Sequence, residues 1–290
     1  MATKTNMSTH FKPETVKDVF SKVKGHSSLV KLSKQIPIAF SGNDIFTFAL
    51  DGEVAIVGEG ENKPAGEATI APVSIVPIKI VYQHRMSDEF LRASEEKALK
   101  MLESFNDGFA KKIARGLDIM AMHGVNPADL VASAKIGNNH LDKCQSTDYT
   151  EGEPEEALNA AIQLIGDYDV TGYALSKSFA TDMGSYKESG ISQYPEFKMG
   201  GNPGKLVGTA CDVNSTVTKG NANALAYVGD FENAFRWGYA DQIPMEVIQY
   251  GDPDGQGDLK RTNEVVLRAE AWIGWGILDQ SAFARIVTGD

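Results

Sequence analysis

A continuous helical pattern over residues 87–123 constrains the fold of this chain more than any other feature. The segment Ser87-Asp-Glu89 is a helix start, because serine can cap the first N–H groups and acids favour the positive end of the helix dipole. Gly124, followed by Asn126-Pro127, ends the helix. Such a helix spans roughly 55 Å and lacks coiled-coil heptads, so a broad surface must cover its apolar face. That face is formed by Phe90, Leu91, Ala98, Leu102, Phe105, Phe109, Ile113, Leu117 and Met120.

Residues 1–43 are a polar, lysine-rich N-terminal arm with too little apolar surface to fold alone. A weak helix from Pro13 to about Lys24 and a short apolar piece at residues 29–32 are its predicted elements. Seven lysines and two acids fall within residues 1–40, a local charge of 7 − 2 = +5, whereas the chain carries −11 and the remainder therefore −16. A basic arm on an acidic body indicates contact with an acidic surface, either a neighbouring copy or nucleic acid, or else a solvated tail.

Residues 44–82 are predicted to form a long two-stranded β excursion. An alternating strand at 45–50 leads through a turn to a second strand at 53–57, and a glycine-rich polar tip follows at 58–66. A return strand at 68–82 contains two prolines, which favours the edge of a sheet. An isolated hairpin of this length is marginal in water, so we expect its partner surface on another molecule.

The remainder of the chain mixes helices and strands. Helices are predicted at 154–165 and 177–185, within a chain that shows no repeats or low-complexity linkers. A polar loop is expected at 126–152. The predicted strands are 170–175, 205–213, 224–229, 243–250 and 260–275, the last two joined by a glycine-rich turn at 251–257. The pattern is that of an α+β fold.

No pattern in the sequence supports an enzyme. Gly58-x-Gly60 lacks the third glycine of a dinucleotide site, and 200–205 departs from a phosphate loop at both ends. His140 and Cys144 have metal-ligand spacing without a second pair. We therefore predict no catalytic, cofactor-binding or metal-binding residues. Two cysteines and no signal peptide indicate synthesis in a reducing cytoplasm, and no run of apolar residues is long enough to span a membrane.

The ordered set of elements resembles the major capsid proteins of tailed bacteriophages, which have the Hong Kong 97 fold. The resemblance covers nearly the whole chain from about residue 30, and it rests on motifs that are weak singly and specific in order. The matching segments are Gly52-Glu-Val-Ala-Ile-Val-Gly-Glu-Gly60 with Val76-Pro-Ile-Lys-Ile-Val-Tyr82 (extended loop), Ser87-Asp-Glu-Phe-Leu-Arg92 (start of the spine helix), Tyr227-Val-Gly-Asp-Phe-Glu232, Val265-Val-Leu-Arg-Ala-Glu-Ala271 and Ala282-Phe283.

This resemblance implies a structural protein that self-assembles into hexamers and pentamers of an icosahedral head around double-stranded DNA, located in the virion capsid and assembled in the bacterial host cytoplasm. It implies partners besides the chain itself: a scaffolding protein, a portal, head-decoration or head-completion proteins, and packaged DNA through non-specific contacts. It also implies an N-terminal arm (1–43), an extended β-loop (44–82), a peripheral domain (83–124 and 223–268) and an axial domain (125–222 and 269–290).

The chain departs from the family prototype in two respects. It lacks the long N-terminal scaffolding segment, and the initial Met1 favours a separate scaffolding protein over proteolytic removal. Lys63 lies at the loop tip, where the prototype forms a covalent cross-link, but no partner Asn or assisting Glu can be matched. Two alternatives are an encapsulin-like shell that encloses a cargo protein and a soluble β-rich binding module, which would be a monomer.

Overall fold

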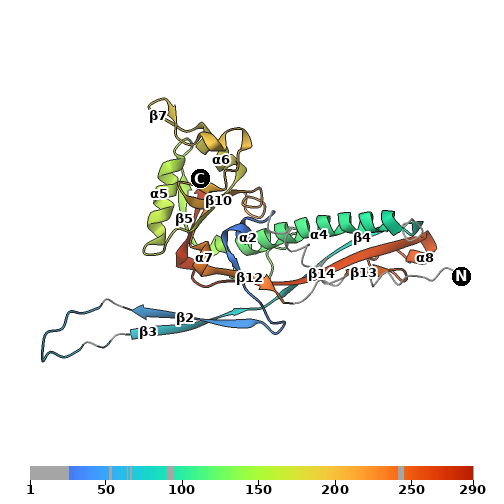
Figure 1. Cartoon of the computed structure of the whole chain (residues 1–290), viewed down its shortest axis with the longest axis horizontal. Helices are drawn as coiled ribbons and strands as arrows, with labels where there is room; N and C mark the ends of the chain where they lie inside the picture. The colour runs from blue at the N-terminus through green and yellow to red at the C-terminus, as the bar shows by residue number, and fades with distance from the viewer. Residues whose placement is uncertain are drawn as a thin grey trace.

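The computed structural model describes residues 26–51, 54–63, 65, 67–89, 95–240 and 245–289. Two β-sheets, a long helix and a projecting hairpin make up these residues (Figure 1). The fold is α+β, as the sequence predicts.

The first sheet has five strands arranged around β14 (Glu264–Ile277). β14 pairs antiparallel with β4 (Ile78–Ser87) along a ladder from Glu264↔Ser87 to Ile273↔Ile78. The long helix α4 (Glu95–His123) lies along this sheet (Figure 1). The remaining elements of this layer are β12 (Phe235–Tyr239), β13 (Met245–Ile248), β1 (Lys34–Gln35) and the short helix α8 (Leu259–Thr262).

The second sheet has six strands in the order β5-β15-β11-β6-β10-β9. Helices α5 (Pro154–Ile165) and α6 (Lys177–Ser185) pack against it and bury their apolar faces there. Its strands are β5 (Gln145–Tyr149), β6 (Gly172–Leu175), β9 (Lys205–Leu206), β10 (Thr209–Val213), β11 (Ala224–Gly229) and β15 (Phe283–Thr288).

Shorter elements connect these layers. Helix α2 (Ser28–Leu32) lies between the two sheets, and the hairpin of β2 (Asn43–Asp51) and β3 (Glu67–Ile75) projects from the molecule (Figure 1). The others are α7 (Phe231–Ala234), β7 (Lys187–Glu188), β8 (Ile191–Ser192) and the 3-10 turns η2 (Leu141–Lys143), η3 (Pro195–Gly200) and η4 (Gln280–Ala282).

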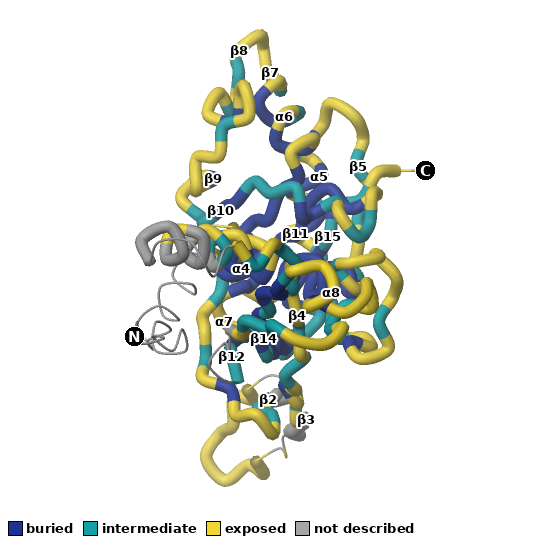
Figure 2. The backbone as a smooth tube through the Cα atoms, turned by 90° about the vertical axis from the view of Figure 1, so that its right-hand side faces the viewer, coloured by how far each residue is buried: buried dark blue, intermediate teal, exposed yellow. Residues whose placement is uncertain are grey.

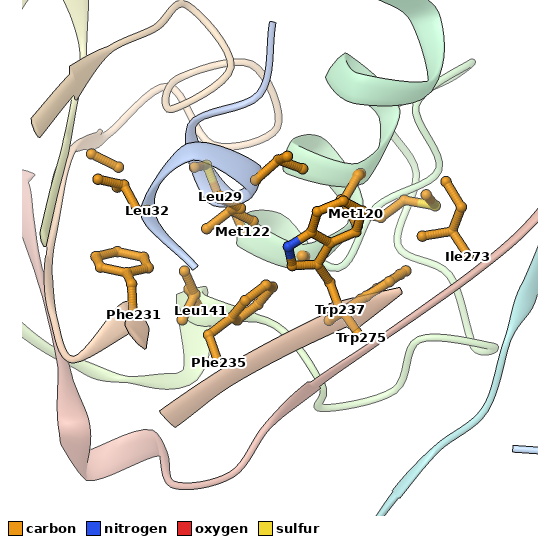
Figure 3. Packing of buried hydrophobic residues seen from close by; sticks show 14 of the residues in the cluster. Leu29, Leu32, Met120, Met122, Leu141, Phe231, Phe235, Trp237, Ile273 and Trp275 are labelled. Carbon is orange, nitrogen blue, oxygen red and sulfur yellow. The ribbon is translucent and has the colours of Figure 1, made fainter. Parts of the chain in front are cut away.

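The larger core forms where the end of α4 meets the five-stranded sheet. Trp237 and Trp275 from β12 and β14 pack there with Leu29 of α2 and Met120 of α4 (Figure 3). A second core lies between α5, α6 and the six-stranded sheet. Burial is therefore concentrated in the middle of the molecule, whereas the β7–β8 turn and the far end of the β2–β3 hairpin are exposed (Figure 2).

Several expected elements are confirmed. Helices α5 and α6 have the predicted limits, and α4 ends where Gly124 adopts a positive φ of 70° and donates its N–H to Met120 O. The weak helix predicted at 13–24 lies outside the described residues.

Other expectations are wrong in the β region. Residues 54–57 form no strand, so the partner of β2 is β3, with Asn43 opposite Ile75 and Asp51 opposite Glu67. The return segment consists of two strands that separate at Pro77, and β4 joins β14 instead of the hairpin. The reason is long-range pairing: β4 offers partly buried side chains that complete the larger sheet. β4 also continues through Ser87, so this residue ends a strand, and its Oγ accepts a hydrogen bond from Glu89 N at 3.3 Å, where the helix begins.

The structure also adds strands where loops or single strands were predicted. β5 lies inside the expected polar loop at 126–152, and the predicted strand 205–213 is a tight hairpin of β9 and β10. β12 and β15 form in segments for which no strand was predicted. Both are stabilised by hydrogen bonds to strands that are distant in the sequence.

Candidate functional site

The β2–β3 hairpin extends away from both cores. Its tip residues 54–63 are all exposed, and Val54 and Ile56 have exposed fractions of 96% and 102%. Phe46, on β2, is 69% exposed. Large apolar side chains this exposed on a narrow projecting ribbon are uncovered within the subunit, and such a group of side chains marks a site of interaction.

The root of the hairpin is anchored firmly. Ile75 is fully buried at the end of β3 and packs over Gly274 and Gly276 of β14. A Cβ at Gly276 would lie 2.7 Å from Ile75 Cγ1, so only glycine permits this close approach. Ile38 fills the neighbouring space over Gly238, where its own chain crosses β12. The subunit therefore fixes the direction of the hairpin and leaves its far end free of its own core.

A buried carboxylate holds the chain where the arm joins the body. Asp118 of α4 is fully buried and accepts hydrogen bonds from Ser27 Oγ at 2.5 Å, Ser28 N at 3.0 Å and Leu29 N at 3.2 Å. Thr216 Oγ1 donates to the same group at 2.8 Å. Burial raises the pKa of Asp118 to about 6, although each of these donors opposes the rise. The carboxylate thus satisfies N–H groups at the start of α2 that the helix itself leaves unpaired.

A second acid completes this attachment. Lys31 Nζ lies 2.5 Å from Asp212 Oδ1 on β10, and Ser28 Oγ donates to Asp212 Oδ2 at 2.7 Å. Asn202 donates to Asp212 as well, at 3.0 Å. Because α2 is tied to α4 through one acid and to the six-stranded sheet through another, it connects the two layers.

Asp142 connects the layers a second time, near the end of α4. It accepts from Tyr227 OH at 2.6 Å, and its Oδ2 lies 3.1 Å from His123 Nδ1. Asn221 and Arg285 also reach this carboxylate. Burial acts to raise the pKa of Asp142, but hydrogen bonds from His123 and Tyr227 outweigh it and hold the pKa below its usual value.

Arg85 orders the loop at the far end of the five-stranded sheet. Its guanidinium binds both oxygens of Asp254, with Nε 3.0 Å from Oδ2, and its Nη1 lies 2.9 Å from Glu264 Oε2. Gly257 O accepts from Arg85 Nη2 at 2.9 Å. A fork of donors in fixed geometry suits this task, so the predicted turn at 251–257 is held in one shape.

The residues considered for chemistry are not brought together. His140 is half-buried, and Cys144 is buried with its pKa raised to about 12 by burial. Lys63 is exposed in the hairpin tip. Within the described ranges, no group of three or more His, Cys, Asp or Glu side chains could hold a metal ion. Among those same residues, no helix is long and apolar enough to cross a membrane.

Comparison with known proteins shows which family has this architecture. The phage capsid family matches residues 11–288 of the chain. The chain belongs to the phage capsid family. A probable major capsid protein of Mycobacterium phage D29 is 22% identical over 96% of the chain and 89% of its own length. A solved chain from Mycobacterium phage Ogopogo is 32% identical with a TM-score of 0.78, covering 91% of this chain and 92% of its own. One from Gordonia phage Cozz has a TM-score of 0.75 at 24% identity, covering 91% and 87%.

This phage capsid protein therefore has the Hong Kong 97-type fold and is a major capsid protein of the virion, with a structural and not an enzymatic role. Capsid proteins act by assembling into multimeric shells. Neither the encapsulin-like shell nor the soluble binding module receives support. The functional surfaces are accordingly those that meet other copies.

The sequence analysis did not predict which residues join the two layers of the capsid protein. Asp118 carries a signal that could have found it, since it is the one acid within the apolar stretch from Ile113 to Met122. A lone acid on a buried helix face must be paired. Asp142 carries no such signal, because it lies in a polar loop segment. Asp212 carries none either, because a single polar residue in a strand ordinarily belongs to the exposed face.

Proposed function

We propose that the capsid protein forms hexamers and pentamers that tile an icosahedral head around double-stranded DNA. Assembly takes place in the cytoplasm of a bacterial host with a scaffolding protein, and the finished head carries a portal and head-decoration or head-completion proteins. One observation carries the self-assembly part of this proposal: the β2–β3 hairpin exposes Phe46, Val54 and Ile56 at a distance from its own subunit's cores. Repetition of such a contact around a ring closes a shell cooperatively.

The division into domains belongs to the same proposal. The N-terminal arm (1–43) and the extended loop (44–82) flank a peripheral domain built on the five-stranded sheet with α4, and the six-stranded sheet with α5 and α6 is the axial domain. The expected borders were 83–124 with 223–268 and 125–222 with 269–290. We place two of them later, near 230 and 277, because β11 pairs within the six-stranded sheet and β14 stays in the five-stranded sheet to Ile277.

In the proposed contact, the hairpin lies across a neighbouring subunit. The side chains of Val54 and Ile56 supply the apolar anchors, since burying one aliphatic side chain contributes at most about 1.5–3 kcal/mol. A repeated interface of standard size, roughly 1,600 Å², then needs only a few such anchors per copy. No catalytic residue takes part.

Shortening the hairpin tests the proposal directly. Asp51 and Glu67 are paired opposite each other, so replacing residues 52–66 with Asn-Gly closes the ladder through a tight two-residue turn. The subunit should remain folded and soluble, because the removed residues that are described are exposed. Electron microscopy and sedimentation should then show that closed particles are lost.

A finer variant separates the anchors from the length of the loop. Val54→Ser with Ile56→Ser should lower particle yield, whereas the matched control Glu59→Gln with Lys63→Gln, at exposed positions of the same tip, should leave it unchanged. Normal shells from the shortened chain would disprove the role of the hairpin. Unfolding of the shortened chain would show instead that the tip belongs to the subunit's own core.

A further inference from the structure

A small basic surface covers about one turn of α4, from Lys111 to Arg115. Between Gly108 and Asn126, the exposed or half-exposed charged side chains of this helix are Lys111, Lys112 and Arg115. They occupy positions i, i+1 and i+4, so they share one side of the helix. Asp118 follows Arg115 by three residues, but it is fully buried and is occupied by α2 and Thr216. Asp107, half-exposed and four residues before Lys111, is the nearest acid on the same side of the helix, so this part of α4 carries a net charge of 3 − 1 = +2.

The segment 214–219 widens this surface with groups that can bind anions. Arg115 Nη1 donates to Ser215 Oγ at 3.2 Å, which places the segment beside the helix. Ser215 and Thr218 are half-exposed, and Lys219 is exposed. Lysine and arginine together with serine and threonine hydroxyls are the side chains that contact phosphate oxygens in nucleic-acid complexes.

The lysine-rich arm joins the body at the same place. Asn214 Nδ2 donates to His26 O at 3.2 Å, so the chain enters the described structure next to Ser215 and Arg115. The sequence before His26 contains five lysines and two acids. The part of the sequence that leads to His26 therefore carries a net charge of 5 − 2 = +3.

The composition of the surface favours nucleic acid over a protein neighbour. Among described residues 104–126 and 208–240, no large hydrophobic side chain is exposed. Protein interfaces are dominated by aromatic and aliphatic anchors, as on the hairpin, whereas contacts to a phosphate backbone need only charge and hydrogen-bond donors. The rest of the chain is acidic, with a net charge of −11 overall, so a local basic strip is the part of the subunit that a packaged duplex can approach.

We propose that Lys111, Lys112, Arg115 and Lys219 form a sequence-independent binding strip for the phosphate backbone of duplex DNA, which makes this side of α4 the interior face of the shell. The inference rests on the proposed function, since it requires a shell that encloses DNA, and it adds which face meets that DNA.

Chemical footprinting on intact particles tests the assignment. DNA-filled heads and heads emptied by DNA ejection are acetylated with a lysine-reactive ester, and each lysine is quantified by mass spectrometry. Lys111, Lys112 and Lys219 should react several-fold more slowly in filled heads than in emptied heads. Lys177, Lys187 and Lys205 are exposed on the other layer and should react equally in both. Equal reactivity of the first set in both states would overturn the assignment, and protection in both would show that a second copy covers the strip, which also overturns it.

DNA binding by the purified chain provides a second test that does not depend on particles. The logarithm of the affinity for a short duplex should fall linearly with the logarithm of salt concentration, with a slope of about 0.9 per phosphate contact. Lys111→Gln, Lys112→Gln and Lys219→Gln together should reduce this slope by roughly 2.7. The control triple Lys177→Gln, Lys187→Gln and Lys205→Gln removes the same charge and should leave the slope unchanged. Equal slopes for the two triples would reject the strip while leaving the shell-forming role intact.

Discussion

The β2–β3 hairpin and the α2 segment both lack a core of their own, but they differ in how far the rest of the subunit buries them. The hairpin keeps only its root, Ile75, buried against β14. In α2, by contrast, Ser28, Leu29, Val30 and Leu32 are all buried between the two layers. The hairpin is thus attached at one end, and α2 is enclosed along its length.

The difference lies in what the surrounding elements offer. Asp118 and Asp212 each accept donors from α2, and the apolar side of α2 enters the larger core. Among the described residues of the hairpin, Ile75 at the root is the only one that is buried. A segment that is enclosed like α2 stabilises the subunit, whereas a segment that is exposed like the hairpin stabilises an assembly of subunits. Substitutions in the two regions should separate these effects.

The largest contrast should come from truncating one apolar residue in each region. Leu29→Ala leaves a cavity in the larger core and should lower the free energy of unfolding by about 2–5 kcal/mol. Ile56→Ala, at a fully exposed position, should change it by less than about 0.5 kcal/mol while reducing particle yield. Urea unfolding of the unassembled subunit, followed by fluorescence of the buried Trp237 and Trp275, measures both. Equal destabilisation by the two variants would remove the distinction between the regions.

Asp118→Asn tests the polar half of the α2 attachment. An amide offers one acceptor oxygen where four donors converge, so the variant should lose about 1–3 kcal/mol of stability. The pH dependence has a definite sign. Because burial raises the pKa of Asp118 to about 6, its stabilising contribution is full below the unfolded value near 4 and is lost as the pH rises through about 6.

The advantage of the wild type over Asp118→Asn should therefore be larger at pH 4 than at pH 7, as measured by urea unfolding at both values. Asn202→Ala removes a donor from the neighbouring Asp212 and is a control for the polar attachment that leaves Asp118 unchanged. An advantage that grows with pH would mean that the hydrogen bonds to Asp118 outweigh its burial.

The same contrast explains what the sequence could predict. Helices α5 and α6 were predicted with their observed limits, since Pro154 at the first turn and the Ser176 cap act within a few residues. The exposed tip of the hairpin was predicted as well, because glycines and polar residues at 58–66 determine it locally. Local chemistry is sufficient where an element depends on its own residues.

Pairing between distant segments was not predictable in this way. β4 and β14 lie far apart in the sequence, and β4 was assigned to the hairpin because its alternation fits either partner. At the start of β14, Val265, Val266 and Leu267 are all buried, so the alternation seen from Leu267 to Ile273 does not extend over the whole strand. The role of the acids that join the layers was not predicted for a related reason. Their partners come from α2, β11 and the segment 214–221, which only the fold brings together.

The smallest expected effect concerns an exposed position where backbone conformation, not burial, decides stability. Val207 is 88% exposed in the two-residue turn between β9 and β10, and its φ of 48° lies in the left-handed region. A β-branched side chain is strained there, whereas asparagine is favoured at the first position of such a turn. Val207→Asn should therefore raise the free energy of unfolding by about 0.5–1 kcal/mol.

A reciprocal change in the same turn provides the control for Val207. Gly208 has a φ of 89°, so Gly208→Ala should destabilise the subunit even though nothing lies within 4 Å of the added methyl group. Thermal unfolding of both variants beside the wild type gives the two signs. If Val207→Asn left the melting temperature unchanged, exposure alone would govern this turn, as it does at Ile56. If it raised the melting temperature but lowered particle yield, the exposed valine would join the hairpin among the surfaces that serve the assembly at the expense of the subunit.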